Sequence, residues 1–332
     1  MLPVRTLHVL GMAFALGGAT LTWWLFRRDD VSSSAAAGTA AAYERGFWAA
    51  TGVLVMTGVG NLGSLAPYVP SAGTRWGTIF AAKLLLLIGV LALSLVRTLV
   101  VRRCLPPNRP PSPPTRPRRR VRRRTRRGRS GSPTPEPRCR SPSSSRWRRC
   151  WRMGEGTPVG TDSDPFTDDP LVVWALASFH TAALVAVLVA ALYLAGPLGD
   201  LLGGLDTLVG LALYLALWAS TWWTTRRALR EVADDTDASA FTVVGVGGKW
   251  GGVNGVLFLW ALLVVVAVPV ADPTLGAVFY FLVFAGIGSL LALGVGGIVG
   301  VAFVAFDLAL FRVASSLSPG AAPGRRETDE TP

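Results

Sequence analysis

The stretch LVVWALASFHTAALVAVLVAALYLA, residues 171–195, decides the fold class of this 332-residue chain. Its 25 residues include no Asp, Glu, Lys or Arg, and about 20 apolar residues in a helix cross the roughly 30 Å hydrocarbon core of a bilayer. Similar apolar runs cover 6–26, 47–66, 77–101, 205–224, 253–271 and 275–311. The sequence therefore predicts an all-α, polytopic helical membrane protein of the cell membrane, with the lipid bilayer as its main partner.

The composition agrees with this prediction. Hydrophobic residues make up 51% of the chain and charged residues only 16%, whereas a soluble domain carries about 25% charged residues. A soluble enzyme is therefore excluded. The sequence also contains no nucleophile–base arrangement, no pair of catalytic carboxylates and no dinucleotide fingerprint, so we do not expect an enzyme. The run VGVGGKW at 244–250 lacks the spacing of a phosphate-binding loop.

The last apolar run sets the number of helices. As one helix its 37 residues would be about 55 Å long, nearly twice the hydrocarbon thickness. We expect it to break at the cluster Gly294, Gly296 and Gly297, which gives eight helices. A single tilted helix would give seven.

Arginines predict the orientation, because cytoplasmic loops carry an excess of Lys and Arg. Arg27, Arg28 and Arg45 flank the first predicted loop, and Arg75 lies alone in the second. We therefore expect an external N-terminus and a cytoplasmic 102–170 segment. The predicted loop around Arg227 is also cytoplasmic. Eight helices place Arg325 and Arg326 outside, and seven place them inside.

The segment between Arg102 and Arg152 differs from the rest of the chain, since it contains 19 of the 33 basic residues and one acidic residue, Glu136. It is rich in Pro and Ser and poor in aliphatic residues, which predicts disorder. Two interpretations stay open. The segment is a natural polybasic linker, or it arises from a frameshift or gene fusion, with Met153 as the start of a second protein.

These observations divide the chain into four parts. Residues 1–103 form a first transmembrane module of three helices, and residues 104–170 form the disordered Arg/Pro-rich linker. Residues 171–313 form a second transmembrane module of four or five helices, and residues 314–332 form a disordered tail.

Three motifs in the first module suggest a family. They are LHVLGMAFALGG at 7–18, TGVGNLG at 57–63 and TRWGTIFAAKL at 74–84. With them, residues 1–103 resemble the copper-resistance D family of membrane proteins. The resemblance implies a helical membrane protein that handles or takes up copper, in a domain that continues into a fourth helix. In this chain the Arg/Pro-rich segment follows the third helix.

Three side chains of the first module suit a copper ion. His8 and Met12 are four residues apart and share one face of a helix, and Met56 lies in the second predicted helix. Imidazole and thioether are ligands that suit copper. Copper is thus the one cofactor that the sequence suggests. The same residues can be explained without a metal. In that alternative the methionines fill gaps in helix packing, and the histidine only forms a hydrogen bond.

Two ionisable residues lie inside apolar runs of the second module, namely His180 and Asp307. A His–Asp pair inside the membrane would stabilise both partners, and such residues are functional candidates. The alternative is that Asp307 lies near the interface and pairs locally with Arg312. The tryptophan pairs Trp23–Trp24 and Trp222–Trp223, each followed by arginines, are typical interface anchors.

Three functions follow from these features. The first is copper handling or transport through the first module. The second is a structural or interaction role without transport. The third, a membrane-anchored nucleic-acid binder, depends wholly on the basic segment, so we do not expect nucleic acid as a partner.

Overall fold

The computed structural model describes residues 2–28, 31–64, 68–71, 73–104, 169–204, 207–235, 239–267 and 274–317. These residues form eight helices and no strand, which confirms the predicted all-α class. The helices are α1 (Leu2–Arg27), α2 (Ser33–Ser64), α3 (Arg75–Cys104), α5 (Pro170–Ala195), α6 (Leu198–Gly204), α7 (Thr207–Ala233), α8 (Ala240–Ala267) and α9 (Leu275–Leu317). Disorder is predicted for 104–170 and 314–332, and of these residues 105–168 and 318–332 lie outside the described part. Cys104 still belongs to α3, and Pro170 already belongs to α5.

Five helices of the described part of the chain are long and apolar enough to cross a membrane. Their candidate spans are Val4–Arg27, Arg75–Arg102, Pro170–Ala195, Ala240–Val265 and Phe281–Ser316. The other two expected spans, 47–66 and 205–224, lie in α2 and α7, which have 32 and 27 residues. Both are long enough for a bilayer, but glycine, threonine and tryptophan make them less apolar than the five.

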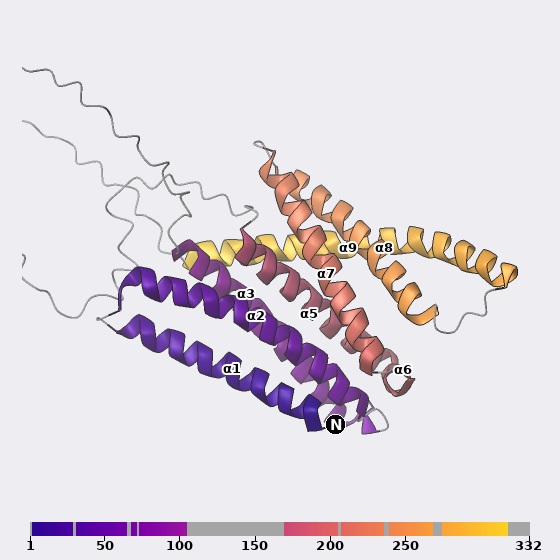
Figure 1. Ribbon diagram of the computed structural model, residues 1–332, viewed down its shortest axis with the longest axis horizontal. Helices are drawn as coiled ribbons and strands as arrows, with labels where there is room; N and C mark the ends of the chain where they lie inside the picture. Colours follow the sequence, from indigo (N-terminus) through magenta and orange to yellow (C-terminus); the bar gives the residue numbers. More distant parts are fainter. Residues whose placement is uncertain are drawn as a thin grey trace, which may run out of the picture.

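Helix α5 lies at the centre of the molecule, packed against α2, α3 and α7 (Figure 1). Its apolar sequence explains this position, because a helix without a charged face can be covered on most sides. It begins where the side chain of Asp169 accepts a hydrogen bond from the Leu171 amide, with Pro170 in the first turn. It ends at Gly196, whose left-handed φ of 99° terminates the helix.

The two modules pack into one bundle. Trp48 of α2, Leu95 of α3 and Phe179 of α5 belong to one buried apolar cluster. At the edge of this cluster Arg102 of α3 lies 3.4 Å from the Asp169 carboxylate. The last residues before segment 105–168 and the first after it therefore lie side by side.

Helix α9 is unbroken over 43 residues, so the break predicted at Gly294, Gly296 and Gly297 is wrong. The reason is that α9 crosses α8 here (Figure 1), with Gly296 against Gly251 and Gly297 against Gly248. A methyl group added to Gly296 would lie 2.5 Å from the carbonyl oxygen of Gly251. The glycines thus allow two helix backbones to touch, as small residues do between membrane helices. Because the last apolar run forms one helix, the described residues contain seven long helices, as the seven-helix alternative predicts.

The C-terminal boundary also needs correction. The predicted tail begins at residue 314, but α9 continues to Leu317 because Ala314 is fully buried in the cluster that contains Leu99, Val172 and Leu229. These residues come from the end of α3, the start of α5 and the end of α7. We call this end of the bundle the basic end, since Arg102 and Arg227 lie near it. Pro197 lies at the opposite end of α5 (Figure 1).

Candidate functional site

The structure directs His8 toward α2. Its Nδ1 atom lies 2.9 Å from the hydroxyl oxygen of Thr57, and its ring edge lies next to Gly58. The Thr57 hydroxyl also contacts the carbonyl oxygen of Val53 at 2.6 Å. The predicted imidazole therefore lies at the α1–α2 interface with a polar partner.

The two methionines of the predicted metal set are placed differently. Met12 lies one turn beyond His8 on α1, but its side chain is 46% exposed. Met56 is half-buried on α2, one residue before Thr57. The structure thus places His8 at the α1–α2 interface and leaves Met12 largely at the surface. Gly52, four residues before Met56 on the same face of α2, lies against Tyr214 of α7 and not against α1. Among the described residues, no group of three or more His, Cys, Asp or Glu side chains gathers as a metal site.

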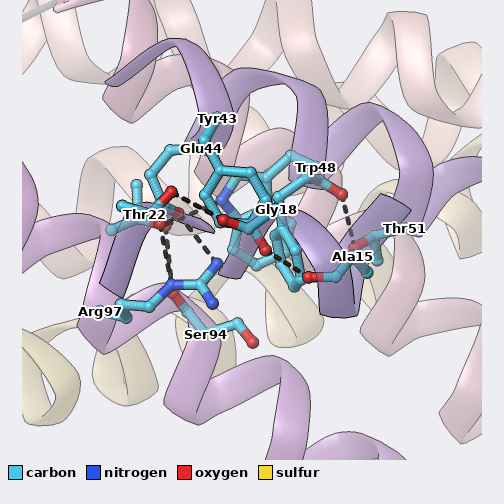
Figure 2. Close-up of polar contacts among 11 residues, drawn as sticks. Ala15, Gly18, Thr22, Tyr43, Glu44, Trp48, Thr51, Ser94 and Arg97 are labelled. Carbon is cyan, nitrogen blue, oxygen red and sulfur yellow. Dashed lines mark hydrogen bonds and ion pairs between the residues drawn. The ribbon is translucent and has the colours of Figure 1, made fainter. Parts of the chain in front are cut away.

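A second polar site joins α2 and α3 around the carboxylate of Glu44, which is 2% exposed (Figure 2). The guanidinium of Arg97 forms an ion pair with this carboxylate, with Nε 2.8 Å from Oε1 and Nη2 3.2 Å from Oε2. The Thr98 hydroxyl donates to Oε2, and the Trp48 indole donates to the Thr98 oxygen at 2.9 Å. The charge of Glu44 is therefore fully compensated inside the bundle.

This site also reaches α1. The hydroxyl of Tyr43 donates to the carbonyl oxygen of Ala15 at 2.6 Å (Figure 2), and the Arg97 guanidinium lies over the Phe47 ring at 4.4 Å. Gly18 provides the space for the Tyr43 ring, because a side chain there would overlap it. The arrangement ties three helices together through hydrogen bonds and one ion pair.

The Glu44–Arg97 pair was not predicted from the sequence. Glu44 lies just before the run 47–66, and Arg97 lies inside the run 77–101. Arg97 itself was an indication of such a pair, since an arginine inside an apolar span requires a nearby anionic or polar partner. Its partner could not be identified from spacing, because the two residues are 53 positions apart on different helices.

The structure does bring His180 and Asp307 together. The Nε2 atom of His180 in α5 lies 3.0 and 3.2 Å from the two carboxylate oxygens of Asp307 in α9. The two side chains are 12% and 11% exposed. Asp307 therefore pairs with His180, and the alternative prediction, a local pair with Arg312, is wrong.

Aromatic rings surround this pair. The imidazole lies 4.4 Å from the Phe303 ring centre and 5.6 Å from that of Phe179. Phe179 stacks on Phe306 and meets Trp48 edge-on. An apolar shell of this kind strengthens the attraction between opposite charges and makes an uncompensated charge costly.

A third polar group lies at the basic end between α7 and α8. Lys249 donates to both carboxylate oxygens of Glu231 at 2.9 Å, and the Trp250 indole donates to one of them at 2.8 Å. These hydrogen bonds, chiefly that of Lys249, hold the pKa of Glu231 below its ordinary value. Both charged side chains are substantially exposed, which is typical of a pair that fixes a helix hairpin at a surface.

Comparison with known proteins gives one similarity. Residues 169–326 match a family model described as a family of unknown function (DUF7965). The matched region begins at the N-cap of α5 and includes α6 to α9. No curated protein and no solved structure matches the chain.

Proposed function

We propose that the protein is a multipass membrane protein that handles copper, with His8 as the first ligand. The observation that carries the proposal is the position of His8, directed at α2 and bonded to Thr57. In this proposal Thr57 orients the ring, as hydrogen-bond partners orient the ligating histidines of metal sites.

Met56 supplies a second donor of the right type. It precedes Thr57 by one residue on α2, and a thioether ligand favours Cu(I) over harder cations. Met12 is a weaker candidate because it is 46% exposed. We therefore expect its replacement to matter less than that of Met56.

The packing around α3 supplies a further argument for the proposal. The resemblance expects a fourth helix after the third, and α5 packs against both α2 and α3. Helix α5 thus provides a fourth helix for the first module, although segment 105–168 separates the two in sequence.

Copper accumulation in cells that express the full chain tests the proposal. We expect His8→Ala to abolish the copper accumulation that depends on the protein, and Met56→Leu to reduce it. Leu7→Ala is the matched control, since Leu7 is the preceding residue on α1 and its side chain is exposed. Membrane insertion is measured for each variant.

Unchanged copper accumulation in His8→Ala, at equal insertion, would contradict the proposal. Equal losses in His8→Ala and Leu7→Ala would do so as well, because they would reflect damage to α1. The structural or interaction role would then describe the first module better.

A further inference from the structure

The His180–Asp307 pair lies near the middle of the bundle. His180 follows the start of α5 by ten residues, and Asp307 precedes the end of α9 by ten. Asp307 lies 3.0 Å from His180. At 1.5 Å per residue, His180 is about 15 Å along α5 from its basic end. That distance corresponds to the centre of a hydrocarbon core of roughly 30 Å.

The charge state of this pair matters because of that position. With a neutral imidazole, Nε2–H donates to the ionised carboxylate and the pair has a net charge of −1. One added proton makes the pair neutral overall, either as imidazolium with carboxylate or as imidazole with carboxylic acid. An unbalanced charge in an apolar interior costs several kcal/mol, so the surroundings favour the proton-loaded pair.

Other ionisable groups on the neighbouring helices do not supply the missing charge. On α2 and α3, Glu44 and Arg97 neutralise each other and connect to His180 through the rings of Trp48 and Phe179. Lys249 of α8 is bonded to Glu231. Among the described side chains, the remaining groups on the helices packed against α5 and α9, and on those two helices themselves, are Tyr43, Arg45, Arg75, Lys83, Arg102, Asp169, Tyr193, Asp200, Tyr214, Arg226, Arg227, Arg230 and Arg312. Within the described residues, the hydrogen bonds of Asp307 come from His180.

We propose that His180 and Asp307 form a proton-binding site at the centre of the membrane bundle, which joins α5 to α9 when it is loaded. On binding, the proton adds to the imidazole–carboxylate pair and no other bond changes. On release, Asp307 keeps a negative charge that the neutral imidazole only partly compensates. Because the pair connects two helices, release weakens the contact between α5 and α9. This site is independent of the copper proposal, which rests on His8.

Nitrogen NMR of the full chain in lipid nanodiscs tests the proposal. The chain contains two histidines, so ¹⁵N-histidine labelling gives one ring spectrum for His8 and one for His180. The spectra are recorded at pH 7.5, and we expect the site of the unmodified chain to hold its proton. If the bound proton is on the imidazole, the NMR spectrum shows two ring protons on His180. If it is on Asp307, the infrared spectrum shows the carbonyl band of a protonated carboxyl group.

The variant Asp307→Asn should remove this proton. We expect its His180 ring to carry a single proton and any carboxylic acid band to disappear, with the His8 spectrum unchanged as the internal control for folding. His180→Gln should reduce the bound protons by one as well. A singly protonated His180 ring in the unmodified chain, without a carboxylic acid band that Asp307→Asn abolishes, would overturn the proposal.

Discussion

Glu44 shows at the scale of single residues how this bundle tolerates charge. Its carboxylate is almost fully buried, and it is matched by Arg97, whose side chain is 37% exposed, and by the hydroxyl of Thr98. Removing one partner of a buried pair leaves a charge without compensation, which costs about 3–5 kcal/mol. The pair therefore holds α2 and α3 in register as long as both members are present.

We predict that Arg97→Met destabilises the bundle by about 3 kcal/mol, the low end of that range because Arg97 is partly exposed. The double variant Glu44→Gln with Arg97→Met should recover part of this loss, since no charge then remains buried. Denaturation of the purified protein, followed by circular dichroism, measures both. A double variant that is less stable than Arg97→Met would contradict this account.

The Glu231–Lys249 pair gives a pH-dependent prediction. The pKa of Glu231 is lowered in the folded protein, so the stabilisation by this carboxylate is present above the ordinary value of 4.5 and is lost as the pH falls through the lowered value. Glu231→Gln should cost up to about 1 kcal/mol at pH 7, as exposed pairs do. The cost should disappear in acid, and an equal cost at both pH values would exclude a contribution from the charge.

At this scale the sequence predicted part of the chemistry. His180 and Asp307 stood out because each interrupts an apolar run, and their pairing could be stated as a hypothesis. The exposure of Met12 could not be foreseen, because the share of α1 covered by α2 depends on where Gly11 and Gly18 meet Leu54 and Tyr43. Spacing on one helix does not determine which neighbour packs on it.

At the scale of elements, α9 is the main difference between expectation and structure. Its length exceeds the thickness of the hydrocarbon core, so a break in the helix was predicted at its glycines. In the structure the glycines of α9 face glycines of α8, and close packing of backbones takes the place of a turn. A helix of this length fits the molecule by crossing the direction of the other helices (Figure 1).

Two glycines of α9 make a matched test of that packing. Gly296→Ala places a methyl group 2.5 Å from the Gly251 carbonyl oxygen, whereas a methyl group at Gly294 meets nothing within 4 Å. We expect Gly296→Ala to destabilise the protein by about 1–3 kcal/mol through overpacking. Gly294→Ala should be neutral or stabilise it by up to about 1 kcal/mol, because alanine favours the helix. Thermal unfolding of the two variants measures the difference, and equal effects would contradict the crossing.

At the scale of the whole molecule, the two modules form one bundle whose connection has adjacent ends. Arg102 and Asp169 lie within 3.4 Å, so the bundle does not need a long connection to join α3 to α5. We predict that replacing residues 105–168 by a short Gly/Ser linker leaves the unfolding temperature of the bundle within a few degrees of its original value. A large loss of stability would show that this segment contributes to the packing of the bundle.

The apolar runs predicted the helices well, because the bilayer dictates their length and composition. The packing of α5 between α2, α3 and α7 could not be predicted, since it joins modules that the basic segment separates in the sequence. The orientation remains a prediction based on arginines. In the structure Arg102 and Arg227 lie toward the same end of the bundle and Pro197 toward the other, whereas residues 105–152 and Asp272 lie outside the described part.

The central claim is that this chain is a membrane-spanning bundle with its basic end in the cytoplasm. It is tested most directly by cysteine labelling from outside intact cells. Pro197→Cys and Arg227→Cys are introduced separately after Cys104, Cys139 and Cys150 have been changed to Ser. We predict that a membrane-impermeant maleimide labels position 197 in intact cells and labels position 227 only after the membrane is opened. Labelling of both positions from the same side would contradict the claim.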